Sequence, residues 1–258
     1  LLPGLVAVGE RIRLTPAADA GPTDLRVESD EDGITVRNAF LGITFPRTGH
    51  GGMPTAVHYP VSGHTETAFE WRDRLYHPDR ERFMLVDDDD ATARVVSKGP
   101  LQVVVETSGQ FVRAGEAPGN NRATYRWTFR AHSPVVGFHA LVEREDDFAW
   151  PELHILQISR KDDRLSAWAG EDAHVQSGPL LDNEDQRAFA KWATLDDGEN
   201  AIGLAWDGAA VGMYDGRSSY VTYIQYSGRL EEPQTSLSGR VYIGPALEPG
   251  RYAEVFHA

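Results

Sequence analysis

Hydrophobic and polar residues alternate along many short runs of this sequence. The clearest run extends from Arg122 to Arg130, where apolar or aromatic residues occupy positions 123, 125, 127 and 129 and polar residues lie between them. Successive side chains of a β-strand point to opposite faces of its sheet. The pattern therefore predicts a strand with one buried face and one polar face.

Two further strand patterns follow, from Val135 to Glu143 and from Glu152 to Ser159. Short polar turns separate the three runs, and strands joined in this way are usually antiparallel neighbours. We therefore expect one sheet surface to collect the reactive side chains of these strands: Arg126, His139, Glu152 and His154.

The rest of the chain repeats the strand pattern at intervals of roughly 8 to 12 residues. The sequence also predicts a last strand from Tyr252 to Phe256. No segment carries a helical apolar stripe longer than about two turns. These features predict an all-β fold, a large sandwich of two antiparallel sheets with few short helices.

Two segments depart from this alternation. Residues 1–24 contain a stretch rich in Pro, Ala, Gly and Asp, which predicts an N-terminal extension or linker and leaves residues 25–258 as the sandwich domain. The segment from Val57 to Leu85 is irregular and dense in His, Arg and aromatic residues. Loops of this composition line clefts more often than they fill cores, so we expect a lid or rim here.

Charge restricts the partners of this protein. The chain has 39 acidic and 25 basic residues, and its formal net charge of −14 opposes binding to nucleic acid or to an anionic membrane. A polyanionic ligand would require a local cluster of Arg and Lys. No apolar run approaches the ~18 residues of a membrane span. The chain has no Cys, so it carries no redox evidence about its compartment. Its start at Leu1 without Met fits a processed secreted form or a domain cut from a longer protein, and a secreted or periplasmic location is favoured over a cytoplasmic one.

The nine His residues raise the question of a metal site. None of them pairs at the i, i+4 spacing of a helical zinc motif, so no cofactor is expected. The acidic run Asp87 to Asp90 lacks the alternate-residue spacing of a calcium-binding loop. A solvated turn is therefore the favoured interpretation of this run, with Ca²⁺ binding as the alternative.

Several segments taken together resemble a known family of sandwiches. The first is a short strand before a glycine-rich turn, with Asn38, Phe40, Gly42 and Phe45. The second is a strand followed by a Ser-Pro-Val-Val turn, in residues 124–136, and the third is a late hairpin, in residues 192–204. Over residues 25–258 the sequence resembles the galactose-mutarotase-like β-supersandwich, above all the versions in polysaccharide lyases and the central domain of exo-rhamnogalacturonan-lyase-like enzymes.

This resemblance implies an oligosaccharide or polysaccharide ligand, held on the concave face of one sheet. It implies catalytic candidates on the central strands and substrate-binding candidates around them. The catalytic candidates are His154, Arg126, His139, Glu152 and Tyr125, and the binding candidates are Arg122, His64, Trp71, Tyr76 and His77. Many enzymes of this kind add a helical domain that this chain lacks, so a further catalytic domain or a second subunit is an expected partner.

Elimination is the leading hypothesis at this point, and two other functions stay open as alternatives. Elimination from an acidic or rhamnose-containing glycan needs a base and a cation that neutralises the sugar carboxylate. His154 with Arg126 suits these roles better than Tyr125, which points to the opposite face of the strand from Arg126. A sugar mutarotase or epimerase would use His139 or His154 with Glu152. A non-catalytic glycan-binding or scaffolding module is the remaining function, and there the Arg side chains form only cross-strand ion pairs.

Overall fold

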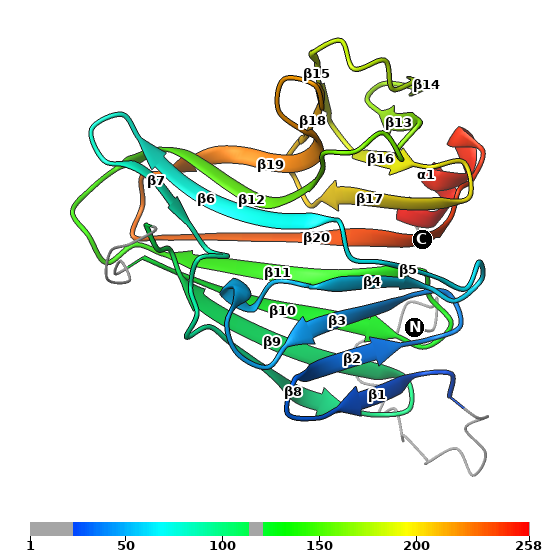
Figure 1. Ribbon diagram of the computed structural model, residues 1–258, viewed down its shortest axis with the longest axis horizontal. Helices are drawn as coiled ribbons and strands as arrows, with labels where there is room; N and C mark the ends of the chain where they lie inside the picture. Colours follow the sequence, from blue (N-terminus) through cyan, green and yellow to red (C-terminus); the bar gives the residue numbers. More distant parts are fainter. Residues whose placement is uncertain (1–22, 114–120, 258) are drawn as a thin grey trace, which may run out of the picture.

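The computed structural model describes residues 23–113 and 121–257, so nearly all of the expected N-terminal extension lies outside the described residues. Within these ranges the strands form three sheets, and every strand pair is antiparallel (Figure 1). A single short 3-10 helix and one α-helix accompany them in the described part of the chain. The prediction of an all-β sandwich with few short helices is confirmed.

The largest sheet has nine strands and the other two have five and six. The nine-stranded sheet has the order β14 (Val175–Pro179), β13 (Ala167–Glu171), β16 (Trp192–Asp196), β17 (Asn200–Trp206), β20 (Gln234–Pro245), β11 (Val135–Glu143), β10 (Arg122–Arg130), β9 (Gln102–Gln110) and β8 (Thr92–Lys98). The six-stranded sheet has the order β15 (Asp185–Phe189), β18 (Val211–Asp215), β19 (Thr222–Leu230), β12 (Trp150–Arg160), β6 (Glu70–His77) and β7 (Glu81–Met84). The five-stranded sheet has the order β1 (Arg26–Ser29), β2 (Gly33–Arg37), β3 (Gly42–Pro46), β4 (Ala56–Tyr59) and β5 (His64–Glu66), and the 3-10 helix η1 (His50–Gly52) follows β3.

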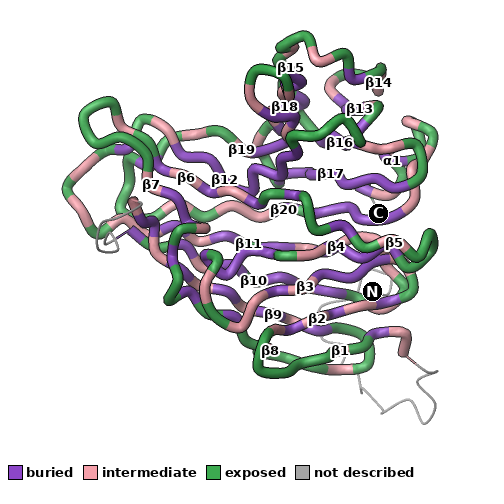
Figure 2. Tube along the Cα trace, in the orientation of Figure 1, coloured by how far each residue is buried: buried purple, intermediate pink, exposed green. Residues whose placement is uncertain are grey.

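The nine-stranded sheet forms one layer, and the five- and six-stranded sheets together form the other (Figure 1). One apolar cluster with members from all three sheets fills the space between the layers, and buried stretches run along most of the long strands (Figure 2). Trp127 of β10 is at its centre, with its ring 5.4 Å from Phe45 of β3 and 6.0 Å from Trp71 of β6. The predicted strand Arg122–Arg130 therefore buries the face that its alternation indicated.

The C-terminal segment is an α-helix, α1 (Pro249–His257), where the sequence predicted a strand from Tyr252 to Phe256. Tyr252 and Phe256 are four residues apart, so both point to the same face of the helix, and both are buried against Trp192 of β16. Pro249 occupies the first turn, where a missing N–H costs nothing. The strand prediction was wrong because two aromatic residues at this spacing also suit one helix face.

Strand β12 lies in a different layer from the two strands that precede it. β10 and β11 pair with each other as predicted, but β11 pairs on its other side with β20, whereas β12 pairs with β6 and β19. The turn after Glu143 therefore carries the chain from one layer to the other. The expectation that all three strands share one sheet surface is wrong.

The segment from Val57 to Leu85 is also more regular than predicted, because it contains β5, β6, β7 and most of β4. In β6, Trp71 and Leu75 face the core, and Asp73 occupies the inward position between them with no exposed surface. A carboxylate at an inward position interrupts the apolar alternation, which explains why the sequence indicated a loop.

Asp73 connects the two layers. Its Oδ2 accepts a hydrogen bond from the Tyr125 hydroxyl of β10, and its Oδ1 accepts one from the Leu156 backbone N–H of β12 at 2.8 Å. Leu156 has a φ of 47° and lies in a β-bulge, where the register between β12 and both of its neighbours shifts. Burial raises the pKa of the Asp73 carboxyl to about 7 from its ordinary 3.8, although both hydrogen bonds favour the ionised form.

Asp73→Asn should change how stability depends on pH. A raised folded-state pKa means that the folded protein holds the proton more tightly than the unfolded chain, so Asp73 stabilises the fold less and less as pH rises from about 4 to 7. Asn resembles the protonated acid and does not titrate. In urea unfolding, the free energy of unfolding of the variant should therefore rise relative to that of the wild type by up to about 4 kcal/mol between pH 4 and 7. Above this range the difference should not change further.

The exposed Asp79, changed to Asn, is the control, and its difference from the wild type should vary little with pH. A difference between Asp73→Asn and the wild type that stays constant from acidic to neutral pH would contradict a buried carboxyl with a raised pKa.

Candidate functional site

The bulge in β12 determines which of its polar side chains reach the outer face of the six-stranded sheet. His154 lies opposite Arg74 of β6, and Gln157 lies opposite Arg72 of the same strand. The extra residue of the bulge lets His154 and Gln157, three positions apart, lie on the same face, where a regular strand would place them on opposite faces. The bulge thereby produces a polar patch on the outer face, defined by Arg72, Arg74, Glu152, His154, Gln157 and Gln225.

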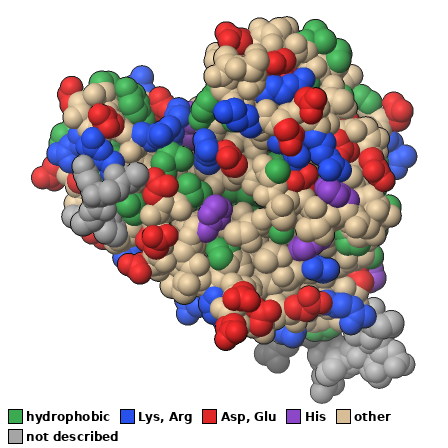
Figure 3. Space-filling view, viewed as in Figure 1, with side chains coloured by type: hydrophobic (Ala, Val, Ile, Leu, Met, Phe, Trp, Pro, Cys, Tyr) green, Lys and Arg blue, Asp and Glu red, His purple; other side chains and the backbone are tan. Residues whose placement is uncertain are grey.

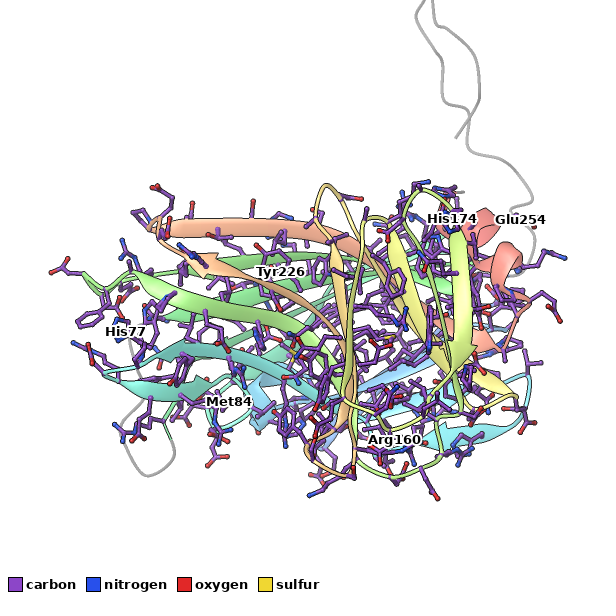
Figure 4. All side chains as sticks on the ribbon, turned by 90° about the horizontal axis from the view of Figure 1, so that it is seen from above. His77, Met84, Arg160, His174, Tyr226 and Glu254 are labelled. Atoms are coloured by element: carbon purple, nitrogen blue, oxygen red, sulfur yellow. The ribbon has the colours of Figure 1, made fainter. Side chains whose placement is uncertain are left out.

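A groove of about 620 Å³ opens at the edge of this patch. Its lining comes from β6, β7, β12 and the segments beside them, with three arginines, three acidic residues, one tyrosine and one methionine: Arg74, Arg82, Arg113, Glu81, Asp87, Glu152, Tyr76 and Met84. Acidic and basic side chains are mixed on this side of the molecule (Figure 3). Figure 4 shows His77 and Met84 on the side of the molecule opposite to α1, and the label Glu254 marks α1.

Glu152 links the groove to His154. Its Oε1 accepts a hydrogen bond from Nε of Arg74 at 2.9 Å and lies 3.3 Å from Nε2 of His154. Beyond His154, the side-chain nitrogen of Gln225 lies 3.5 Å from Nε2 and donates to Ser227 at 2.6 Å.

His154 is neutral over most of the pH range in which proteins work. Burial lowers its pKa to about 4 and the positive charge of Arg74 lowers it as well, whereas the negative charge of Glu152 and the neighbouring Gln157 side chain oppose them. The side chain of His154 is only 10% exposed, which accounts for the dominant effect of burial. The ring is therefore a hydrogen-bonding group here and a weak base.

Three buried side chains of this patch keep unused hydrogen-bonding capacity. No hydrogen bond of good geometry from the described residues reaches Nδ1 of His154, Oε1 of Gln157 or Oε1 of Gln225, although Gln157 is close enough to His154 to raise its pKa. An unpartnered buried acceptor costs roughly 1 to 3 kcal/mol, so native proteins hold few of them. Three such atoms on one face indicate a place where a ligand or ordered water completes the structure.

The structure divides the predicted catalytic residues between two surfaces. Glu152 and His154 belong to the polar patch, whereas Arg126 and His139 are cross-strand neighbours on the outer face of the nine-stranded sheet. The prediction that His154 and Arg126 lie in one site is therefore wrong, because the two residues belong to different layers of the sandwich. Arg74 takes the place that the sequence assigned to Arg126, because it lies opposite His154 in the register of β6 and β12.

Two predicted residues lie in the core. Tyr125 and Trp71 are each 1% exposed, and Tyr125 donates its hydroxyl hydrogen to Asp73. Neither side chain is open to a ligand. The prediction of a catalytic Tyr125 and a substrate-binding Trp71 is thus corrected by their burial between the layers.

The remaining binding candidates are dispersed. Tyr76 lines the groove, and Arg122 is exposed on the nine-stranded sheet. His77 packs edge-on against Phe148, with ring centroids 5.3 Å apart, and His64 stacks on Tyr59 in the five-stranded sheet. Of these candidates, only Tyr76 is in a position to contact a ligand of the groove.

Sequence reasoning missed Arg74, Gln157 and Gln225. A signal for Arg74 was present, because Arg72, Arg74 and Tyr76 alternate with the inward residues of β6. No comparable signal marked Gln157, whose outward position depends on the bulge.

The acidic run Asp87 to Asp90 has a structural use. Asp88 is buried, and its carboxylate accepts hydrogen bonds from the backbone N–H of Gln110 at 2.7 Å and of Asp90 at 3.0 Å. Within the described residues, no three His, Asp or Glu side chains group in a way that could hold a metal ion. Ca²⁺ binding by this run stays a prediction. In the same residues, no helix is long and apolar enough to cross a membrane.

Comparison with solved structures shows what this sandwich resembles. An alpha-mannosidase from Enterococcus faecalis V583 matches 85% of this chain with a TM-score of 0.61 and 9% identity. An alpha-N-acetylgalactosaminidase from Bifidobacterium bifidum matches 83% with a TM-score of 0.54 and 13% identity, and a 4-alpha-glucanotransferase from Thermococcus litoralis matches 85% with a TM-score of 0.52 and 10% identity. At such low identities the similarity establishes the β-sandwich fold.

This chain spans about a third of each of those proteins, 30%, 36% and 39% of their lengths respectively. No protein-family model matches the sequence, and no curated protein matches it.

The contacts of His154 predict how its pKa responds to its neighbours. Arg74→Met removes a positive charge that disfavours the protonated ring, so the pKa should rise from about 4 toward its ordinary value of 6.5. Glu152→Gln removes the opposing negative charge and should lower the pKa further. Titration of the ring resonances by NMR, assigned with His154→Gln, measures both shifts.

Arg72→Met is the matched control, because Arg72 lies on the same strand and face but pairs with Glu70. It should leave the His154 titration nearly unchanged. Equal shifts in the Arg72 and Arg74 variants would contradict the specific contact through Glu152.

Proposed function

We propose that this protein is a glycan-binding β-sandwich, with its sugar site at the groove and the adjoining polar patch. The observation that carries the proposal is the set of three unpartnered buried atoms on His154, Gln157 and Gln225. A sugar hydroxyl both donates and accepts a hydrogen bond, so it suits each of these atoms. The shared fold with enzymes named for mannosides, N-acetylgalactosaminides and glucans supports a role with carbohydrates.

The shape and lining of the groove support the same ligand class. At about 620 Å³ it is within the range of ligand-sized pockets. Tyr76 at its rim is partly exposed and offers an apolar ring face for a pyranose. Arg74 and Glu152 already form an ion pair, and such pairs present several donors and acceptors to a sugar without a large net charge.

Elimination from a uronate-containing glycan is the second candidate function. The observation that favours it is the contact of His154 and Arg74 through Glu152, since a neutral imidazole beside a cation is the base and neutraliser that this chemistry requires. Two features oppose it. A pKa of about 4 makes His154 a weak base, and Arg74 is already neutralised by Glu152.

A sugar mutarotase or epimerase would need its acid and its base on opposite sides of the sugar ring. Glu152 and His154 lie 3.3 Å apart and side by side, which suits one shared contact better than two opposed ones. A partner domain that completes a catalytic site fits the short span of this chain relative to its structural neighbours. Secretion, which would bring the protein to polysaccharides outside the cell, belongs to the same proposal.

Gln157→Leu tests the binding site through stability and affinity together. Leu has a similar volume and no acceptor, so it should raise the free energy of unfolding of the unliganded protein by about 1 kcal/mol or more. The same change should weaken binding of oligosaccharides about tenfold, because one hydrogen bond to the sugar is lost. Chemical denaturation and calorimetric titration measure the two effects.

The exposed Gln102, changed to Leu, is the control and should alter neither quantity by much. Loss of stability in Gln157→Leu, or unchanged affinity for every glycan that the wild type binds, would remove the proposed site.

The wild-type protein should retain glycans in affinity gels without releasing unsaturated uronate from them. The reason is that His154 is a weak base and both arginines of the patch are engaged in ion pairs. Ultraviolet absorbance of the unsaturated product is the measurement, and polarimetry on free sugars tests epimerisation in parallel. If unsaturated product forms, and if His154→Ala abolishes it while His139→Ala on the other sheet does not, the protein catalyses elimination and does not only bind glycans.

A further inference from the structure

The outer face of the nine-stranded sheet is covered on one half only. Helix α1 packs on the half that contains β13, β16 and β17, where Tyr252 and Phe256 meet Trp192 and Tyr242. No described element packs on the other half, formed by β8 to β11 and the adjoining part of β20. This open half-face is therefore a second surface, on the opposite layer of the sandwich from the proposed glycan groove.

Charged and polar side chains cross this half-face in one row. Arg94, Glu106, Arg126, His139 and Ser238 are consecutive cross-strand neighbours on β8, β9, β10, β11 and β20. Glu106 is shared, since it accepts from Nε of Arg94 at 3.1 Å and from Nε of Arg126 at 2.9 Å. The row therefore carries an excess of positive charge even after its ion pairs are counted.

A hollow of about 570 Å³ lies beside this row. Three arginines, Arg126, Arg130 and Arg240, line it together with His139, and Asp207 is its one carboxylate among the described residues. Small residues also line it, among them Gly137, Gly239 and Thr128. An excess of cations around a hollow is unusual in a chain with a net charge of −14.

The cations of the hollow differ in what they already bind. Arg126 shares Glu106 with Arg94, and Arg240 donates to the backbone carbonyl of Phe256 at the end of α1. Nδ1 of His139 bonds with Ser238 at 2.9 Å. The guanidinium of Arg130 makes no hydrogen bond or ion pair with any residue in 23–113 or 121–257.

The strand geometry places Arg126, Arg130 and Arg240 around one position of the sheet. Arg126 and Arg130 lie on the same face of β10, each two residues from Thr128, which places their Cα atoms about 7 Å on either side of it. Gly137 of β11 pairs with Thr128 on one side and with Arg240 of β20 on the other. The three arginines therefore start from positions around Thr128 and Gly137, and of the three Arg130 is the one not held by another group of the described chain.

We propose that this hollow binds a small oxyanion, the carboxylate or sulfate group of an acidic sugar or a free oxyanion of the same chemistry. Guanidinium forks bind such groups with paired charge-assisted hydrogen bonds. The ligand has to be small, because salt screens charge over about 8 Å at physiological ionic strength and the surrounding surface of an acidic chain repels long polyanions. The proposal does not depend on the glycan groove, which lies on the other layer.

The test is a titration of the full chain with three probes: inorganic sulfate, glucuronate and glucose. Changes in the NMR signals of the arginine Nε–H groups report binding, and Arg130→Gln should weaken sulfate and glucuronate about tenfold. Arg94→Gln is the matched control, because Arg94 shares Glu106 with Arg126 but lies outside the hollow. It should change the affinity less than twofold.

Each outcome decides the matter. The site is supported if sulfate and glucuronate bind and Arg130→Gln weakens this binding while Arg94→Gln does not. If only sulfate binds in this way, the ligand class narrows to free oxyanions. Equal losses in the two variants would show a diffuse field effect and overturn it, as would no binding of either anion. Glucose should not shift the arginine signals, and Arg130→Gln should leave glycan affinity at the groove unchanged, so failure here is distinct from failure of the proposed function.

Discussion

The contact of Asp73 with Tyr125 and Leu156 is the constraint on which the outer surface of this protein depends. One carboxylate, with no exposed surface, receives a hydroxyl from one layer of the sandwich and a backbone N–H from the bulge of β12. A left-handed backbone at a leucine costs energy, so it persists only where its surroundings hold it. Asp73 supplies that support, and the bulge then brings His154 and Gln157 to one face.

The polar patch combines an open groove with buried polar atoms that lack hydrogen-bond partners. Buried polar atoms of His154, Gln157 and Gln225 remain without partners of good geometry among the described residues, although the fold elsewhere satisfies carboxylates such as Asp73 and Asp88 with several donors. Unpaired acceptors next to an open groove make sense if a ligand supplies the missing donors. Rigid strands hold them in position, so little ordering is needed when the ligand arrives.

The two layers differ in how they treat their arginines. On the six-stranded sheet, Arg72 and Arg74 are each neutralised by a glutamate, Glu70 and Glu152, which suits recognition of neutral hydroxyl groups. On the nine-stranded sheet, Arg130 lacks such a partner within the described ranges, which suits an anion. The acidic chain thus has two outer faces of different chemical character.

The sequence by itself determined the two-faced strands, because alternation is a local property: β10 and β11 were predicted with their observed bounds, and the all-β class followed from them. It did not determine that β12 crosses to the other layer or that Arg74 lies beside His154, since these depend on pairing between segments some 80 residues apart. Asp73 concealed β6 in the sequence because an inward carboxylate breaks the pattern of a buried strand. Only the tertiary structure shows why that carboxylate is tolerated. Its N–H partner, 83 residues away, comes within reach when β12 pairs with β6, and its hydroxyl partner, 52 residues away, does so only after the two layers have packed.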